Sequence, residues 1–363
     1  MSEELERYSV IKGTYTIDSL IGKGAFGKVY KVRHKYLGIQ ALKIFNPGVI
    51  SKATEGDLFN EAFLLSKITH NNVVRVYEAN TFEYSGKQYY YIVMEYVKGP
   101  TLAEFLEENC QLEIDKALNI MKDICSGLAQ AHKLNPPIVH RDVKPHNILL
   151  EIGGNKVVSK VSDFGVAKHL DPVTRVTDAA GTIAFMPPEV MSNYENTASD
   201  VYSAGIILYM MSTGIFPFRM PKDYQTNTKK GIENLIKLTR GSLPDPPSNH
   251  NSNIPKELDR IILKSLNPDI KYRYQDAEEF LNSIKHYQEE SKQHIKEDLE
   301  KQLDPPILEN INQALKLGKQ YSTLKEAIRL METVIIEAPS DKKEMLKNKY
   351  KFLLENWRKG IVM

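Results

Sequence analysis

The stretch 138–150, IVHRDVKPHNILL, constrains the fold of this chain more than any other. It places an acid, Asp142, a base, Lys144, and an amide, Asn147, close together between apolar runs. A loop held between a buried helix and a short strand could direct all three side chains into one cleft. Further along, a second carboxylate, Asp163, precedes an aromatic residue and a glycine. Two carboxylates and an Asn amide suit divalent-metal and phosphate chemistry.

The order and spacing of these residues resemble the catalytic loop and the metal-binding loop of protein kinases. The matching residues are His140, Arg141, Asp142, Lys144, Asn147, Asp163, Phe164 and Gly165. The resemblance implies an α+β, two-lobed kinase-like fold, with a small β-rich lobe and a large helical lobe, followed here by an all-helical C-terminal extension. It gives structural roles to His140, Arg141 and Phe164.

A glycine-rich segment lies near the N-terminus, where Gly22, Gly24 and Gly27 follow Ile21. Glycines at this spacing permit a tight hairpin whose backbone amides approach phosphates without interference from a Cβ atom. The same pattern fits a dinucleotide site, but that site needs a helix after the glycines. Val29 and its neighbours form strands readily, so we expect a strand here and a kinase-type flap over the nucleotide.

A lysine, Lys43, lies within an apolar strand pattern. Burying a lysine is costly unless it is paired, although most such side chains extend to the surface. By resemblance, Lys43 contacts the α- and β-phosphates and pairs with a glutamate on the next helix. Apolar spacing predicts that helix over 57–68. We therefore expect Glu61 to be the partner, with Glu55 the weaker candidate because it lies outside the periodic stretch.

The segment 95–99 corresponds by resemblance to the hinge between the two lobes. The backbone around Glu95 and Val97 would hydrogen-bond adenine, and Met94 would lie at the back of the pocket. The apolar contacts to adenine would come from Ile21, Val29, Ala41 and Leu149.

The polar stretch 166–180 resembles an activation loop and carries two phosphosite candidates, Thr174 and Thr177. A phosphate on either would satisfy the charge of Arg141, which adjoins the catalytic acid. We expect Thr182 to brace the catalytic loop instead of serving as a phosphosite.

Three charged residues downstream have structural roles by resemblance. Glu189 closes the activation segment, with Pro187 in place of the usual alanine. Asp200 begins a buried helix and would accept hydrogen bonds from catalytic-loop amides. Arg273 would pair with Glu189, although it lies two residues farther from Pro268 than the family pattern predicts.

Charge and cysteine content narrow the functional classes. The formal net charge of +2 over 363 residues provides no strong basic field, so we expect no nucleic-acid partner. Two cysteines do not make a disulfide framework, which favours a reducing, cytoplasmic location. No run of about 18 apolar residues occurs, and we expect no membrane span.

The organisation along the chain follows from these segments. We expect an N-terminal tail (1–9), a kinase domain (10–290, divided into a small lobe 10–94, a hinge 95–99 and a large lobe 100–290) and a helical extension (295–363). A break at Asp304-Pro305-Pro306 precedes the extension's helical spacing. Residues 317–339 faintly resemble a tetratricopeptide-type helix pair. The extension could pack on the kinase lobe, bind a protein partner or self-associate.

The resemblance implies a protein serine/threonine kinase of the eukaryotic-like type found in bacteria, which uses ATP and Mg²⁺, with Mn²⁺ as an alternative. Asp142 would accept the proton of a protein Ser or Thr hydroxyl, and Lys144 would neutralise the transferring phosphoryl group. Asn147 and Asp163 would hold the metal. We also expect phosphorylation of the chain by itself on the activation loop.

Two other readings compete with this one. A pseudokinase scaffold would recruit partners through the C-terminal helices, but no catalytic position is lost. A small-molecule kinase is disfavoured by Asp200 and by the Pro-Pro-Glu segment at 187–189.

Overall fold

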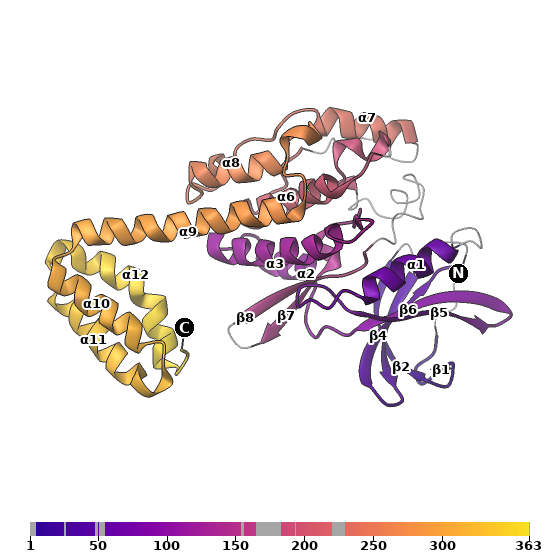
Figure 1. Ribbon diagram of the computed structural model, residues 1–363, viewed down its shortest axis with the longest axis horizontal. Coiled ribbons are helices and arrows are strands. Elements are labelled where there is room, and N and C mark those ends of the chain that lie inside the picture. Colours follow the sequence, from indigo (N-terminus) through magenta and orange to yellow (C-terminus); the bar gives the residue numbers. More distant parts are fainter. Residues whose placement is uncertain are drawn as a thin grey trace. The chain divides into compact units, whose positions relative to one another are not determined.

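The computed structural model describes residues 5–24, 27–47, 50, 55–153, 156–164, 183–192, 194–219 and 229–362. The chain divides into two compact units, residues 1–285 and 286–363. The first contains the small and large lobes, and the second contains the C-terminal helices (Figure 1).

The small lobe is built on an antiparallel sheet with the strand order β1-β2-β3-β4-β6-β5. Its strands are β1 (Val10–Ile11), β2 (Tyr15–Gly24), β3 (Gly27–His34), β4 (Gly38–Phe45), β5 (Val76–Tyr84) and β6 (Lys87–Glu95). Successive side chains of a strand face opposite sides. Leu42 and Ile44 of β4 therefore join one hydrophobic cluster, and Ala41 and Phe45 join another.

The helix of the small lobe, α1 (Glu55–Ser66), covers the face with Ala41 and Phe45, and its Leu58 belongs to that cluster (Figure 1). The apolar spacing predicted its start at 57, but the helix begins at Glu55. The hydroxyl of Tyr90 on β6 donates to Glu55 Oε2 at 3.3 Å, which ties this first turn to the sheet.

The hairpin between β5 and β6 is paired up to Tyr84 and Lys87, on either side of its turn. Ser85 and Gly86 have φ values of 50° and 71°, the conformation of a tight two-residue turn. The strands can therefore pair up to the turn itself. At the other end β5 begins only at Val76, because Val73 forms an isolated parallel bridge with Val161.

The large lobe contains α2 (Leu102–Glu108), α3 (Ile114–His132), the hairpin β7 (Ile148–Gly153) and β8 (Lys156–Val161), α6 (Thr197–Thr213), α7 (Lys229–Arg240), α8 (Lys256–Ser265) and α9 (Ala277–Gln302). Nearly every residue of α6 is buried, as expected of a helix that is apolar all round. Asn196 caps its start, and Gly214 ends it with φ 74°. This confirms the predicted buried helix.

The two lobes are joined where the loop after α1 meets α3 and β8. The amide of Val161 donates to the carbonyl of Asn72 at 2.9 Å, and the amide of Val74 donates back to the carbonyl of Val161 at 2.9 Å. Helix α3 approaches closely through Gly127, where a Cβ atom would lie 2.3 Å from the Asn72 carbonyl oxygen. This contact fixes the strand that leads into Asp163.

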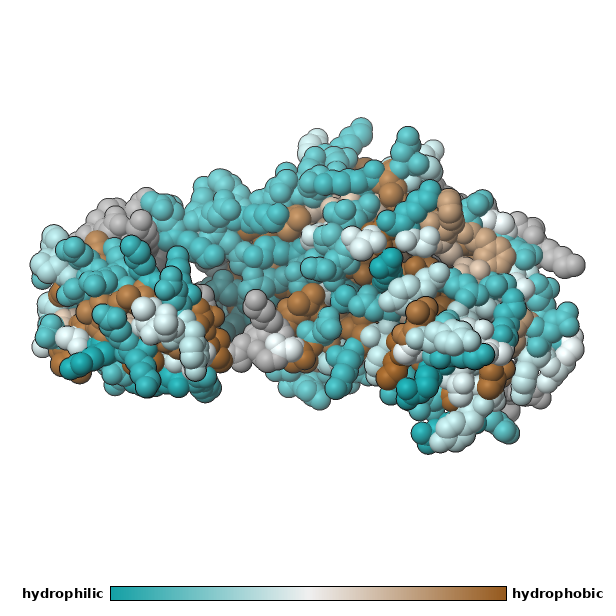
Figure 2. Space-filling view, turned by 60° about the horizontal axis from the view of Figure 1, so that its bottom comes forward, coloured by the Kyte–Doolittle hydropathy of each residue, from teal (hydrophilic) through white to brown (hydrophobic). Residues whose placement is uncertain are grey.

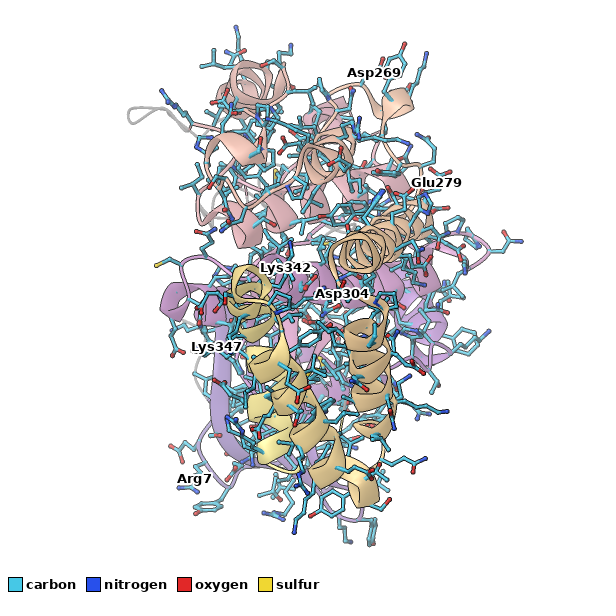
Figure 3. All side chains as sticks on the ribbon, turned by 90° about the vertical axis from the view of Figure 1, so that its left-hand side faces the viewer. Arg7, Asp269, Glu279, Asp304, Lys342 and Lys347 are labelled. Carbon is cyan, nitrogen blue, oxygen red and sulfur yellow. The ribbon has the colours of Figure 1, made fainter. Side chains whose placement is uncertain are left out.

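The second unit consists of the end of α9 together with α10 (Pro305–Leu317), α11 (Leu324–Glu337) and α12 (Ser340–Arg358). As the Asp-Pro-Pro break predicted, α9 ends before Asp304, which is the N-cap of α10 (Figure 3). The three helices share a hydrophobic core of their own, and Trp357 of α12 packs against Gly318. The likeness to a tetratricopeptide pair stays a prediction.

The described helices of both units lack the combination of length and apolar composition that a bilayer span requires. On the face seen in Figure 2, hydrophilic side chains are interspersed with small hydrophobic groups.

Candidate active site

The catalytic loop follows α3, and the buried side chain of His140 holds it in place. The His140 ring Nδ1 accepts from the Asp142 amide at 3.3 Å, so Nε2 carries the proton and donates to the Ser162 carbonyl at 2.8 Å. The ring also packs against Phe164, with the ring centroids 4.6 Å apart. One side chain thus joins the loop to the segment that carries Asp163.

Asp142, Lys144 and Asn147 form one hydrogen-bonded group, as their spacing predicted. Lys144 Nζ lies 2.8 Å from Asp142 Oδ2. Asn147 Nδ2 donates to the Asp142 carbonyl at 2.7 Å and to Asp142 Oδ2 at 3.0 Å. A short 3₁₀ turn, Pro145–Asn147, closes the loop and brings the amide back to the acid.

Asp163 forms an ion pair with a lysine of the small lobe. Lys43 Nζ is 2.8 Å from Asp163 Oδ1. The backbone of Asp163 is left-handed, with φ 61°. Burial alone would raise the pKa of this carboxyl, but Lys43, with smaller effects from His140 and Lys144, holds the pKa below its usual value. Asp163 is therefore ionised at neutral pH.

The structure shows Lys43 paired with Asp163, and the predicted pairing of Lys43 with Glu61 stays a prediction. Among the described residues, the carboxylate that Lys43 contacts is Asp163. Glu61 lies half-buried on α1. The side chain of Lys43 is only 7% exposed, so its charge needs a partner within direct reach, and Asp163 supplies it.

Asp200 anchors the catalytic loop, as predicted. It accepts the amides of His140 at 2.7 Å and Arg141 at 2.9 Å. These two bonds hold Arg141 with φ 64°, so the loop turns sharply just before Asp142. Arg141 Nε lies 3.8 Å from Glu195 Oε2.

Asp200 has a third hydrogen-bond partner, His132 at the end of α3, which the sequence analysis missed. Its Nδ1 accepts from the Ala277 amide at 3.3 Å, which leaves Nε2 as the donor to Asp200 Oδ2 at 2.9 Å. Burial alone would raise the pKa of Asp200, but the hydrogen bond from His132, with smaller effects from His140, holds this pKa below its usual value. A histidine on the buried stripe of α3 was the available signal.

Replacing Asp200 with asparagine is expected to lower the unfolding free energy at pH 7 by about 2–3 kcal/mol, because hydrogen bonds to a charged acceptor are lost. The folded pKa of Asp200 is lowered, so its contribution is full above the unfolded pKa of about 4 and is lost below that value, as pH falls through the folded pKa. Urea unfolding at pH 7 and at about pH 3 should show the variant's deficit shrinking in acid. The exposed Asp115→Asn is the control. A deficit equal at both pH values would contradict this account.

The residues expected around adenine come together in one hydrophobic cluster. It includes Ala41, Met94 and Val97, with Val29 and Leu149 packed against it. Ala41 is paired with Met94 across β4 and β6. Ile21 lies on β2 with 46% of its surface exposed.

Of the two hinge residues Glu95 and Val97, Val97 is the one whose backbone N–H and carbonyl are available to hydrogen-bond a nucleotide base. Among the described residues, neither its N–H nor its carbonyl takes part in a hydrogen bond. The amide of Glu95 donates to the Arg75 carbonyl at 2.9 Å, and its carboxylate pairs with Lys160 at 2.7 Å. A base entering the cluster would therefore find its backbone donor at Val97.

The glycine-rich segment forms the expected hairpin, with Gly22 opposite Val29 and Gly24 opposite Gly27. A strand follows it, which confirms the kinase-type flap over the dinucleotide alternative. Gly27 also has a packing reason: a Cβ atom there would lie 2.1 Å from the Ile44 carbonyl oxygen on β4.

The pairing of Glu189 with Arg273 is confirmed. Two guanidinium nitrogens donate to the two carboxylate oxygens, each at 2.7 Å. The 3₁₀ turn Ile270–Tyr272 takes up the two extra residues after Pro268. The predicted Gly165, Thr174, Thr177 and Thr182 lie outside the described residues.

Comparisons with known proteins agree with this geometry. The family model described as "Protein kinase domain" matches residues 15–287. The chain is 31% identical over 285 residues to the probable serine/threonine-protein kinase PknB of Lactococcus lactis, covering 77% of this chain and 42% of that protein. It is 33% identical over 283 residues to the serine/threonine-protein kinase PrkC of Bacillus subtilis, covering 76% of this chain and 40% of that protein. The chain thus spans about two fifths of the length of these relatives.

A solved structure, the PknI kinase domain of Mycobacterium tuberculosis, has the same fold. It superposes with a TM-score of 0.59 at 21% identity, covering 78% of this chain and 99% of that one.

Proposed function

This chain belongs to the protein kinase family, and from that premise we propose that it transfers the γ-phosphoryl group of ATP to serine and threonine hydroxyls of proteins. The observation that carries the proposal is the hydrogen-bonded group of Asp142, Lys144 and Asn147, taken together with the Lys43–Asp163 ion pair. It supplies a base, cations for phosphate and oxygen donors for a metal.

The residues present fit a magnesium ion. Nδ2 of Asn147 is committed to Asp142, so the oxygen of the same amide is the atom available to a metal. Asp163 is ionised and offers carboxylate oxygen, the donor type that Mg²⁺ prefers. When bound, the ion would neutralise phosphate charge. The same oxygen donors would accept Mn²⁺.

Asp142 would orient the substrate hydroxyl and take its proton as the hydroxyl oxygen bonds to the γ-phosphorus. The bond between that phosphorus and the β–γ bridging oxygen breaks, and ADP leaves with the electron pair. Lys144, 2.8 Å from Asp142, would balance charge on the transferring group. Lys43 would hold the α- and β-phosphates, and its pairing with Glu61 in the nucleotide-bound enzyme stays a prediction.

We also propose the domain limits given above, with a kinase domain at 10–290 and an extension at 295–363. The two compact units and the extension's own hydrophobic core support them. A separately packed helical unit could bind a protein partner or a second copy of the chain. Both cysteines are free, which supports a cytoplasmic location.

The test is phosphotransfer by the purified full chain with ATP, Mg²⁺ and casein, with phosphosites mapped by mass spectrometry. We expect phosphoserine and phosphothreonine on casein, and phosphate on Thr174 or Thr177 of the chain itself. If a Thr174→Ala/Thr177→Ala variant kept full activity, control by phosphorylation of the activation loop would be refuted and the transferase activity would stand. Nucleotide binding without transfer to any protein would instead support a scaffold.

A further inference from the structure

A buried arginine, Arg240, ends helix α7 and has no role in the chemistry described so far. Only 1% of its surface is exposed. Its Nη2 donates to the Ala184 carbonyl at 2.7 Å and, at 3.5 Å, reaches the Ile183 carbonyl. Among the described residues it forms no ion pair with a carboxylate.

This arrangement is costly, because Nε and Nη1 of Arg240 are buried and have no hydrogen-bond partner within the part of the chain that the structure describes. Burial also lowers the pKa of the guanidinium. The faces of Phe218 and Phe216, at 4.3 Å and 5.7 Å from its central carbon, offset part of the cost through cation–π contact. An apolar side chain could fill the same space without unsatisfied donors, so packing alone does not explain an arginine here.

The segment that Arg240 holds lies beside the catalytic loop. Ser203 of α6 donates to the Phe185 carbonyl at 2.8 Å. Asp200, which anchors the catalytic loop, lies three residues earlier on the same helix, a rise of about 4.5 Å. Residues 183–186 are therefore anchored within about one helical turn of the point that anchors the catalytic loop.

Helix α7 supports the same segment from the other side. Ile183, Met186 and Val190 form one hydrophobic cluster with Ile232, Leu235 and Ile236 of α7. Ala184 between them is only half-buried, so it presents a surface to an incoming chain. Because this segment and the catalytic loop are both anchored to α6, a peptide whose hydroxyl reaches Asp142 would place its neighbouring residues toward this surface.

We propose that Arg240 is a positioning residue for the protein substrate, which holds the Ile183-Ala184 backbone in the shape that receives residues next to the phosphoacceptor. The proposal rests on the proposed function and adds a determinant of substrate recognition to it. Arg240 acts through the backbone of 183–184 and does not touch the substrate. Its loss should therefore weaken peptide binding and leave nucleotide binding intact.

The test compares Arg240→Met and Arg240→Lys with Arg260→Met, a control on α8 whose side chain is 75% exposed. For Arg240→Met we expect the KM for a peptide substrate to rise about tenfold, as for loss of one charge-assisted hydrogen bond. The KM for ATP should stay within about twofold. Arg240→Lys, which keeps a cation able to donate to Ala184, should recover part of the loss.

A second measurement does not depend on activity. Hydrogen exchange in the peptide covering 183–190 should quicken in Arg240→Met, and exchange in 138–147 should be unchanged. An unchanged peptide KM, or equal losses for peptide and ATP, would overturn the proposal. So would unchanged exchange at 183–190. A wild-type chain without phosphotransfer would instead refute the proposed function, and the exchange result would still decide whether Arg240 positions the segment.

Discussion

An Asp142→Asn chain is expected to lose about 10³-fold in kcat for phosphotransfer to a peptide, within the range that general-base groups contribute. Asparagine has nearly the same shape as aspartate. The Asn147 side chain donates to the backbone carbonyl of residue 142, so this hydrogen bond is retained in the variant. The amide cannot accept the hydroxyl proton, and Lys144 loses the carboxylate now 2.8 Å away. The defect should therefore lie in turnover.

Steady-state kinetics with ATP radiolabelled in its γ-phosphate would measure the loss in kcat. Binding of mant-ADP would measure nucleotide affinity in the same variant. Nucleotide affinity should stay within about threefold, because the adenine cluster and Lys43 are untouched. Asp115→Asn, an exposed aspartate at the start of α3, is the control for a lost surface charge. If Asp142→Asn kept more than about a tenth of the wild-type kcat, Asp142 would not be the base that this mechanism requires.

An Asp163→Asn chain should also lose about 10³-fold in kcat, but for a different reason, since the charge that holds the metal is gone. Asn147 would be left as a neutral donor, and Lys43 would lose its ion-pair partner. We expect the dependence of nucleotide binding on Mg²⁺ to weaken at least about tenfold, an effect that Asp142→Asn should not produce.

Titration of mant-ADP at a series of Mg²⁺ concentrations separates the two variants. Without Mg²⁺, wild type and Asp163→Asn should bind the nucleotide with similar affinity. The same Mg²⁺ dependence in wild type and Asp163→Asn would remove Asp163 from the metal site. If the Mg²⁺ dependence of mant-ADP binding changed in Asp142→Asn and not in Asp163→Asn, Asp142 would be the metal-binding carboxylate instead of Asp163.

The catalytic group was predictable from sequence because its members are linked by a short chain. Lys144 lies two positions after Asp142 and Asn147 five positions after it, so only a few loop shapes are open to them. The strand after the glycines and the buried helix around Asp200 were predictable for a related reason. Strand propensity, apolar periodicity and helix-ending glycines are local properties.

The partners of charged groups distant in sequence were not predictable in this way. The sequence analysis paired Lys43 only with Glu61, and the contact of Lys43 with Asp163, 120 positions along the chain, came from the structure. His132 and Arg240 carried no motif, and they gained their roles only when Asp200 and Ala184 were packed against them. Gly27 was read as a phosphate-loop residue, and its close contact with Ile44 depends on how β3 meets β4.

The sequence by itself therefore determined the chemistry: which acids, cations and amides form the site, and which local elements carry them. Only the tertiary structure decided which distant charges neutralise one another and which backbone each buried polar group supports. The physical reason is that local order depends on side chains a few bonds apart. The cost of burying a charge depends on every group that packing brings within hydrogen-bond distance.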